Sequence, residues 1–282
     1  MKNKVVVITG ATSGIGRVAA EALASMGARL ILTARDQTRG EETVASLAPP
    51  HEGRHRVVYG DLSTLAEMRR LAAEIASSEP KIDVLVNNAG AMFDKREVTA
   101  DGLERTFALN HMAYFVITER LMPSLAASPS ARIVSTASSS HSHANLDFSD
   151  LQGALTRTAF ANAYARSKLC NVLWTRELAR RLAGSAVSAN TFHPGFIASR
   201  FGDNFSGPLR GIFRALKTFG ASPEKGAETL VYLASSPEVE GQSGGYWEKR
   251  RRVEPSVSAR DSEAGARLWA ESDRIVWQHE VA

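Results

Sequence analysis

The residues Val5-Val6-Val7-Ile8-Thr9-Gly10-Ala11-Thr12-Ser13-Gly14-Ile15-Gly16 decide the fold of this chain. Four β-branched apolar residues in a row are typical of a strand that is buried on both faces. After the glycines the apolar spacing becomes helical, and one helix face would carry Ile15, Val18, Ala19, Ala22 and Leu23. The stretch therefore predicts a strand, a glycine-rich turn and a helix.

Such a turn can hold a phosphate group. Glycines let the backbone approach an anion, and the helix amino terminus offers unpaired N–H groups at the positive end of the helix dipole. No Gly-Lys-Ser/Thr follows the glycines, which argues against a nucleotide-hydrolase loop. Gly10 and Gly14 are separated by three residues, whereas the common dinucleotide fingerprint has one. From this stretch alone, a tight turn that only packs the helix on the strand is the alternative.

The composition is that of a soluble globular protein. The chain has 282 residues, a hydrophobic fraction of 44%, a charged fraction of 23% and a net charge of +4, which suits one large α/β domain. No apolar run approaches the ~18 residues needed to span a membrane, and no signal peptide is visible. Cys170 is the one cysteine, which excludes an internal disulfide. We therefore expect a cytoplasmic protein.

Four consecutive basic residues form the run Lys249–Arg252. Aromatic residues do not interleave with a wider basic surface, so a nucleic-acid partner is not expected. The run predicts a solvated surface segment. An anionic partner and an acidic lipid surface are the alternatives.

Strand-like and helix-like segments alternate along the whole chain. The predicted strands are residues 5–9, 30–33, 56–59, 84–87, 132–136, 187–192 and 245–247, and the predicted helices include 39–47, 65–76, 103–125, 161–182 and 223–233. Repeated β-α units predict one domain, residues 1–282, with a doubly wound parallel sheet of about seven strands and helices on both faces. Ligands of such sheets bind at the carboxyl ends of the strands. Within this domain, residues 196–221 are expected to form a substrate lid and residues 248–282 a C-terminal extension.

Tyr164 and Lys168 are four residues apart on a predicted helix and therefore share a face. A nearby lysine cation favours the phenolate and lowers the pKa of tyrosine from about 10 toward neutrality. A lone pair with this spacing is commonly a surface pair. Here the helix follows the strand that ends near Ser138, so the three polar groups are expected to meet at the carboxyl edge of the sheet.

Five motifs occur in order, namely Thr9-Gly10-x-x-x-Gly14-Ile15-Gly16, Asn87-Asn88-Ala89-Gly90, Ser138, Tyr164-x-x-x-Lys168 and Pro194-Gly195. With these motifs the chain resembles the short-chain dehydrogenases/reductases of the single-domain branch, over nearly its whole length. The resemblance implies a Rossmann fold, a nicotinamide cofactor and no metal. It also implies that Tyr164 is the general acid/base and that Ser138 binds the substrate oxygen, with Ser139 as the alternative serine.

Further site residues are implied by the same resemblance. Lys168 would lower the pKa of Tyr164 and bind the nicotinamide ribose, and Asn110 would hold a water in a proton relay. The pyrophosphate would lie on Gly10, Thr12, Ser13, Gly14, Ile15 and Gly16. Adenine and its ribose would contact Asp61, Leu62, Asn88, Ala89 and Gly90. The nicotinamide side would be bound by Tyr164, Lys168, Pro194, Gly195, Ile197 and Ser199.

The end of the second predicted strand favours NADP(H) over NAD(H). Family members that prefer NAD carry an acid there, which binds the ribose 2′-hydroxyl. This chain has Ala34 followed by Arg35, whose guanidinium can pair with a 2′-phosphate. Ser13 or Arg17 would assist, and Asp36 is expected to point elsewhere.

A finer resemblance is to the retinol dehydrogenase-like group. It is carried by Asp101-Gly102-Leu103, Phe107-Ala108-Leu109-Asn110-His111, His193-Pro194-Gly195 and Leu268-Trp269. It implies interconversion of a carbonyl and an alcohol on a small, apolar substrate. Because cellular NADPH pools are usually reduced, reduction is the expected direction. Four aromatic residues would line the substrate cleft or pack within the lid, namely Phe201, Phe205, Phe213 and Phe219.

Two alternatives to this function stay open. An enzyme on the same fold can reduce a C=C bond instead of a carbonyl. A dinucleotide-sensing binding protein would need the glycine turn but not the set Ser138, Tyr164 and Lys168, so the presence of that set argues against it. A homo-oligomer is possible, although the C-terminal extension could cover the long helices through which the family associates.

Overall fold

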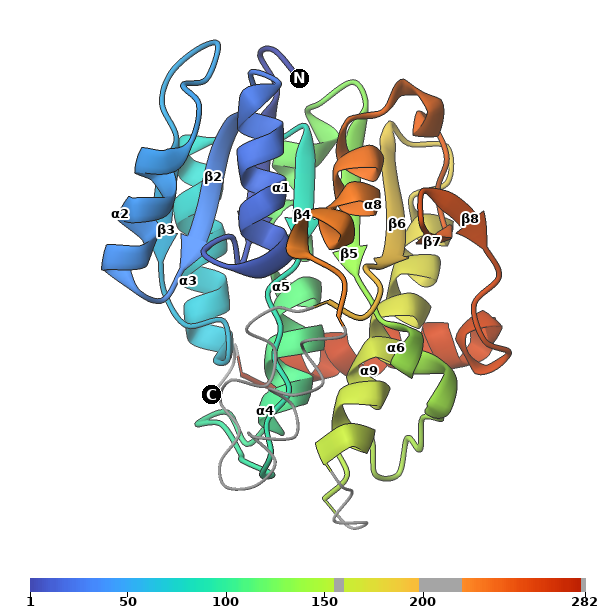
Figure 1. Cartoon of the computed structure of the whole chain (residues 1–282). Coiled ribbons are helices and arrows are strands. Elements are labelled where there is room, and N and C mark those ends of the chain that lie inside the picture. Colours follow the sequence, from blue (N-terminus) through green and yellow to red (C-terminus); the bar gives the residue numbers. More distant parts are fainter. Residues whose placement is uncertain (155–159, 198–219, 280–282) are drawn as a thin grey trace.

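A single mixed sheet forms the centre of the computed structural model, which describes residues 1–154, 160–197 and 220–279 (Figure 1). Its eight strands follow the order β3-β2-β1-β4-β5-β6-β7-β8. Neighbouring strands from β3 to β7 pair in parallel, and β8 pairs antiparallel with β7. The strands are β1 (Val5–Thr9), β2 (Arg29–Ala34), β3 (Arg56–Tyr59), β4 (Val84–Asn87), β5 (Ala131–Thr136), β6 (Val187–His193), β7 (Tyr246–Glu248) and β8 (Arg251–Val253).

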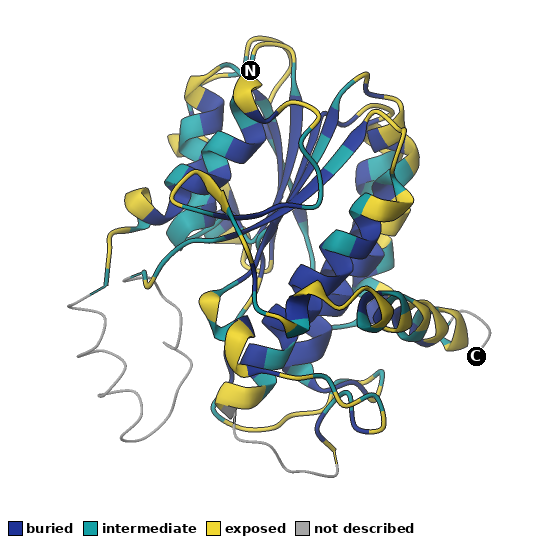
Figure 2. Cartoon of the chain, turned by 90° about the vertical axis from the view of Figure 1, so that its right-hand side faces the viewer, coloured by how far each residue is buried: buried dark blue, intermediate teal, exposed yellow. Residues whose placement is uncertain are grey.

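Helices cover both faces of this sheet (Figures 1 and 2). One layer holds α1 (Gly14–Ser25), α2 (Gln37–Ser46) and α8 (Pro223–Ser235). The other holds α3 (Leu65–Ser78), α5 (Ala113–Ala126) and α6 (Phe160–Arg181), with α9 (Ser262–Gln278) packed on α6. Short 3-10 turns complete the chain, namely η2 (Ser139–His143), η3 (Pro237–Val239) and η4 (Ser258–Arg260). The doubly wound α/β fold is confirmed.

The first strand shows why a run of β-branched residues predicts this fold. Val6 and Ile8 belong to the core beneath α1 and α8, whereas Val5 and Val7 belong to the core beneath α3, α5 and α6. Successive side chains of a strand point to opposite faces, and a strand covered on both faces must be apolar at every position. All five residues of β1 are buried.

The number of strands was underestimated, because the eighth lies within the basic run. Lys249 and Arg250 form the turn between β7 and β8, with φ of 50° and 62°, and Arg251 and Arg252 are exposed on β8. Two-residue turns with both φ positive usually carry Asn-Gly, so no turn signal was present in the sequence. An edge strand tolerates charged side chains because they reach solvent. The predicted exposure of Lys249–Arg252 is confirmed.

The helical segment predicted over residues 103–125 is present over residues 105–126, but it is not one regular α-helix. The carboxylate of Glu104 accepts hydrogen bonds from the backbone N–H groups of Thr106 and Phe107, and α4 begins at Arg105. After α4 (Arg105–Phe107) the chain makes a π-helical turn, η1 (Ala108–Met112), before α5. The π-turn inserts extra backbone into the helix without interrupting the apolar pattern, so the sequence pattern does not reveal it.

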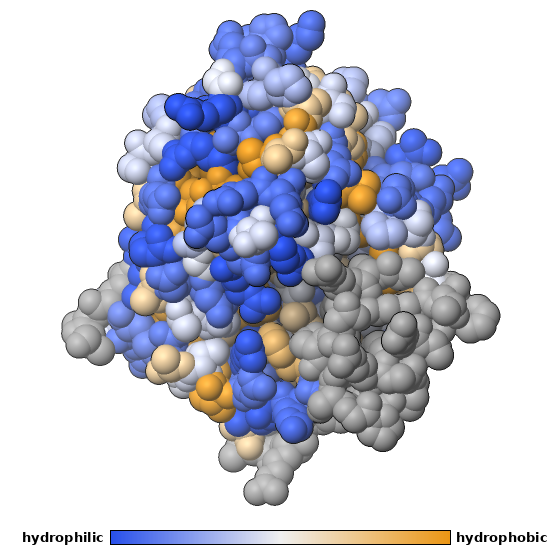
Figure 3. All heavy atoms as spheres, turned by 60° about the vertical axis from the view of Figure 1, so that its left-hand side comes forward, coloured by the Kyte–Doolittle hydropathy of each residue, from blue (hydrophilic) through white to orange (hydrophobic). Residues whose placement is uncertain are grey.

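No helix within the described ranges is long and apolar enough to cross a bilayer. The face turned toward the viewer in Figure 3 is mostly hydrophilic, with apolar side chains gathered in small patches.

The amino ends of β1 and β4 are joined by a buried carboxylate. Asp83 accepts hydrogen bonds from Val5 N (2.9 Å), Ser128 Oγ (2.8 Å) and Lys4 Nζ (3.0 Å), and is 1% exposed. Burial by itself raises the pKa of Asp83, but the hydrogen bonds from Val5, Ser128 and Lys4 outweigh it, so the pKa lies below its ordinary value.

Replacing this carboxylate is expected to destabilise the fold. Asp83→Ala leaves three donors without their acceptor and should lower the free energy of unfolding by about 2–4 kcal/mol. A depressed pKa contributes stability above the unfolded pKa of about 3.9, and this is lost as pH falls through the folded pKa, so acid should weaken the wild type more than the variant. Urea unfolding against pH measures both effects. Glu21→Ala, which removes an exposed ion pair with Arg17, is the control and should change stability by about 0.5 kcal/mol or less.

Candidate active site

Hydrogen bonds around Asn88 hold the carboxyl ends of β1, β4 and β5 together. Thr9 Oγ1 accepts from the backbone N–H groups of Asn88 (2.9 Å) and Ala89 (3.0 Å). The Asn88 amide donates to the carbonyls of Thr9 and Gly10, both at 3.2 Å, and accepts from Thr136 Oγ1 at 3.2 Å. Two of the predicted adenosine-side residues, Asn88 and Ala89, are therefore fixed against the end of β1 and the glycine turn.

At Gly10 and Gly16 the glycine turn is packed too closely to admit a side chain. Gly10 has φ of 68°, and a Cβ atom there would lie 2.8 Å from Ala89 Cα. A Cβ atom on Gly16 would lie 2.4 Å from the Gly10 carbonyl oxygen. Ser13 is the N-cap residue of α1 and makes no side-chain capping hydrogen bond. Bare backbone at the positive end of a twelve-residue helix fits a pyrophosphate.

Ser138, Tyr164 and Lys168 meet at the same edge of the sheet. Ser138 follows β5 and makes a hydrogen bond with the Tyr164 side chain. Lys168 Nζ donates to the Thr136 carbonyl at 3.0 Å and lies 5.6 Å from the centre of the Tyr164 ring. The alternative serine, Ser139, is exposed and uses its backbone N–H to bind His193 Nδ1 at 3.1 Å. Ser138, and not Ser139, is the serine beside Tyr164.

Burial dominates the protonation of this cluster. Burial raises the pKa of Tyr164, and the hydrogen bond with Ser138 offsets only part of that rise. Burial also lowers the pKa of Lys168 to about 7. The expected lowering of the Tyr164 pKa by Lys168 is not seen in the chain alone. The ammonium lies over the phenol ring and gives its hydrogen bond to Thr136, while both groups are desolvated.

Asn110 lies in the π-turn η1 and ties it to two neighbours. Its Oδ1 accepts from Ala91 N at 2.9 Å, and its Nδ2 donates to Ala91 O at 2.9 Å and to Ser167 Oγ at 3.0 Å. These hydrogen bonds link the segment after β4 to α6 at the residue before Lys168. Asn110 itself is fully buried.

The remaining predicted cofactor residues follow the other strands. Arg35 follows β2, Asp61 and Leu62 follow β3, and the range 194–197 follows β6. Because these strands are parallel, all of these positions lie at one edge of the sheet. Ser199 and the four lid aromatics lie outside the described residues, namely Phe201, Phe205, Phe213 and Phe219.

A second arginine at this edge was not predicted. Arg39 Nη2 donates to the Thr12 carbonyl of the glycine turn at 3.2 Å. Asp36 caps α2 by accepting from Arg39 N at 2.8 Å, so its carboxylate points into the helix, as expected. Arg35 is exposed beside this cap.

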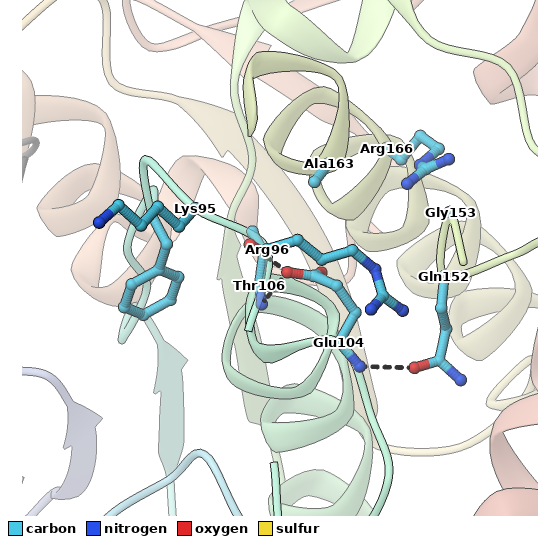
Figure 4. A pocket seen from close by; sticks show the side chains of 9 residues that line it. Lys95, Arg96, Glu104, Thr106, Gln152, Gly153, Ala163 and Arg166 are labelled. Carbon is cyan, nitrogen blue, oxygen red and sulfur yellow. Dashed lines mark hydrogen bonds between the residues drawn. The ribbon is translucent and has the colours of Figure 1, made fainter. Parts of the chain in front are cut away.

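A shallow hollow lies beside the first turns of α6 (Figure 4). Lys95, Arg96 and Arg166 contribute positive charge to it, and Gln152 Oε1 accepts from Glu104 N at 2.7 Å. Ser138, Tyr164, Lys168 and Asn110 are not among its lining residues, so the hollow adjoins the catalytic cluster without being formed by it.

A parallel sheet with a glycine turn after β1 and a tyrosine–lysine pair on the helix after β5 defines a dinucleotide-binding oxidoreductase of the Rossmann type. The short chain dehydrogenase family model matches residues 4–207, and the chain belongs to this family, whose fold binds a nicotinamide dinucleotide.

Known relatives support the finer resemblance. The chain is 38% identical to retinol dehydrogenase 14 of Mus musculus, over 98% of this chain and 86% of the relative. A crystal structure of an uncharacterised protein from Mycobacterium paratuberculosis is 32% identical, with a TM-score of 0.80 over 98% of this chain and 94% of that chain. The NADP complex of RhlG from Pseudomonas aeruginosa is 26% identical, with a TM-score of 0.69 over 87% and 94% of the two chains. The retinol dehydrogenase-like resemblance is confirmed.

The buried lysine is expected to make stability depend on pH in the cofactor-free protein. The folded chain holds Lys168 neutral above pH of about 7, whereas the unfolded chain keeps its proton until about pH 10. Between these values the unfolded state binds more protons, so the contribution of Lys168 to stability rises with pH. Relative to Lys168→Met, the wild type should gain free energy of unfolding from pH 7 to 10.

Chemical unfolding at several pH values measures this difference. Lys81→Met changes an exposed lysine and serves as the control, for which we expect a flat difference over the same range. A flat difference for Lys168→Met as well would contradict a neutral buried lysine.

Proposed function

We propose that the protein is an NADP(H)-dependent oxidoreductase that interconverts a carbonyl, in an aldehyde or ketone, and an alcohol. The observation that carries the proposal is the buried cluster at the carboxyl edge. Tyr164 is hydrogen-bonded to Ser138, and the ammonium of Lys168 lies over the tyrosine ring. This cluster follows β5, two strands from the glycine turn on β1 in the same sheet.

The proposed roles follow from the chemistry of these groups. A bound nicotinamide supplies the hydride. In the reductive direction Tyr164 gives its phenolic proton to the substrate oxygen, and Ser138 holds that oxygen by a hydrogen bond. A phenol with a raised pKa is protonated at neutral pH, which is the state that reduction requires.

Lys168 is proposed to restore the proton on Tyr164 and to bind the nicotinamide ribose. Its pKa of about 7 lets it exist in both protonation states near neutrality. Asn110 would fix the π-turn beside it and hold the water of a proton relay. A small apolar substrate is favoured by the ring of Phe196, which is 57% exposed two residues after Pro194.

The preference for NADP(H) is proposed from the groups after β2. Ala34 places no carboxylate there, and Asp36 is turned into the cap of α2. Arg35 is exposed to receive a 2′-phosphate, and Arg39 is held at the glycine turn by the Thr12 carbonyl. Two guanidinium groups at this position favour a dianion over a hydroxyl group.

Removing either guanidinium should weaken the binding of NADPH more than the binding of NADH. Arg35→Ala and Arg39→Ala are each expected to weaken NADPH binding about tenfold, because a hydrogen bond to a charged group is lost, with little change for NADH. Fluorescence titration with both dinucleotides measures this. Arg54→Ala, an exposed arginine in the loop before β3, is the control and should change neither affinity. Equal losses for NADPH and NADH would contradict the proposed preference.

The catalytic role of the tyrosine is tested by NADPH consumption across a panel of aldehydes, ketones and quinones. Tyr164→Phe should lower turnover by roughly 10²–10⁴-fold, because the proton donor is lost while the ring remains. Tyr59→Phe removes a phenol at the end of β3 and should leave turnover unchanged.

Product analysis distinguishes the remaining outcomes. An alcohol product supports carbonyl reduction, whereas a saturated C–C bond would assign C=C reduction instead. Tight NADPH binding without turnover on any compound would favour a dinucleotide sensor. Unchanged turnover of Tyr164→Phe would contradict the assignment of the acid.

A further inference from the structure

Two buried histidines lie next to proposed catalytic residues, and each contacts the C-terminal part of the chain. His111 follows Asn110 directly, and His141 lies three residues after Ser138. His111 is 0% exposed and His141 is 3% exposed. Neither imidazole takes part in the proposed chemistry.

His141 connects the Ser138 turn to the segment before α9. Its Nδ1 lies 2.7 Å from the Ser138 carbonyl, and its Nε2 accepts from the Ser256 backbone N–H at 3.1 Å. Because Nε2 is an acceptor, the proton is on Nδ1, which donates to Ser138. The ring also packs edge-on against Tyr246 at 4.9 Å. The backbone of Ser138 is therefore held by a neutral imidazole whose other nitrogen depends on Ser256.

His111 connects the π-turn that carries Asn110 to α9. Its Nε2 lies 2.9 Å from Ser272 Oγ on α9, and both residues are fully buried. His111 lies inside the π-turn Ala108–Met112, so its position and that of the Asn110 side chain are set by the same backbone turn. Aromatic rings surround the imidazole, namely Phe107, Phe115 and Trp174.

The C-terminal segment is itself firmly placed. Trp269 of α9 packs against Arg181 (4.2 Å) and against Phe115 (5.1 Å). Arg69 of α3 donates to the carbonyls of Val276 (2.8 Å) and His279 (3.0 Å) at the end of α9. A cation at the carboxyl end of a helix interacts favourably with the helix dipole. In Figure 1 this helix crosses behind α6, on the face away from α1 and α8.

We propose that residues 254–279 position the catalytic site from behind, setting Ser138 through His141 and Asn110 through His111. The matched family region ends at residue 207, so this segment lies beyond it. The inference rests on the proposed function, since it assigns His111, His141 and Ser272 as positioning residues for that chemistry. A small displacement of a catalytic group can cost a large factor in rate without changing cofactor binding.

Four variants, two in this segment and two at His141, separate positioning from stability. Ser272→Ala removes the partner of His111, and His141→Phe removes both bonds of His141. Ile275→Val changes a buried apolar residue of α9 whose side chain can form no hydrogen bond with either histidine. Ile275→Val controls for a general loosening of α9. His141→Gln keeps one donor and one acceptor and tests for rescue.

We expect Ser272→Ala and His141→Phe to lower kcat about tenfold with the Kd for NADPH unchanged. Ile275→Val should lower Tm similarly to Ser272→Ala without lowering kcat, and His141→Gln should regain part of the kcat lost in His141→Phe. In cofactor-free protein, hydrogen exchange should rise in residues 106–116 for Ser272→Ala and in residues 138–146 for His141→Phe.

Two results would overturn the inference. One is a loss of kcat that is proportional to the loss of Tm in every variant, including Ile275→Val. The other is hydrogen exchange in residues 106–116 and 138–146 that does not change in the respective variants. The exchange measurement needs no turnover, so it decides the inference even where the wild type reduces no carbonyl and the proposed function itself fails.

Discussion

The site depends on the hydrogen bonds of the Asn88 side-chain amide. Asn88 follows β4, and its amide donates to the carbonyls of Thr9 and Gly10 at the end of β1. The same amide accepts a hydrogen bond from Thr136 at the end of β5. A parallel sheet ends with unpaired backbone groups at one edge, and buried polar groups need partners. Asn88 satisfies several of them at once. The glycine turn can therefore approach Ala89 closely, and Thr136 is fixed as the acceptor for Lys168.

A buried ammonium beside a buried phenol is costly unless hydrogen bonds compensate for lost solvation. The carbonyl of Thr136 and the hydroxyl of Ser138 supply those bonds, and both come from β5 or the residues after it. The pKa of Lys168 falls and that of Tyr164 rises for the same reason, since each change favours a neutral form. In the chain alone the site therefore holds its proton on the phenol.

The sequence predicted those parts of the fold and site that rest on local patterns. Apolar residues at every position of β1 reflect burial on both faces, and the spacing of Tyr164 and Lys168 places them on one helix face. The π-turn at Asn110 leaves the apolar pattern intact, and β8 consists of charged residues that carry no strand pattern, so both were missed. Arg39 was missed because its contact with Thr12 depends on how α2 docks on the glycine turn. The contacts of His111 with α9 and of His141 with Ser256 join residues more than 100 positions apart, which no local pattern encodes.

The hairpin of β7 and β8 also affects whether two copies of the protein associate. Among the described strands β8 is the last on its side, and its outer backbone groups face outward. Such an edge is a template for pairing with another chain at the usual strand spacing of about 4.8 Å. Lys249, Arg250, Arg251 and Arg252 are exposed along this edge and its turn. Two copies meeting there would set like charges against each other, so this run of cations protects the sheet from edge-to-edge aggregation.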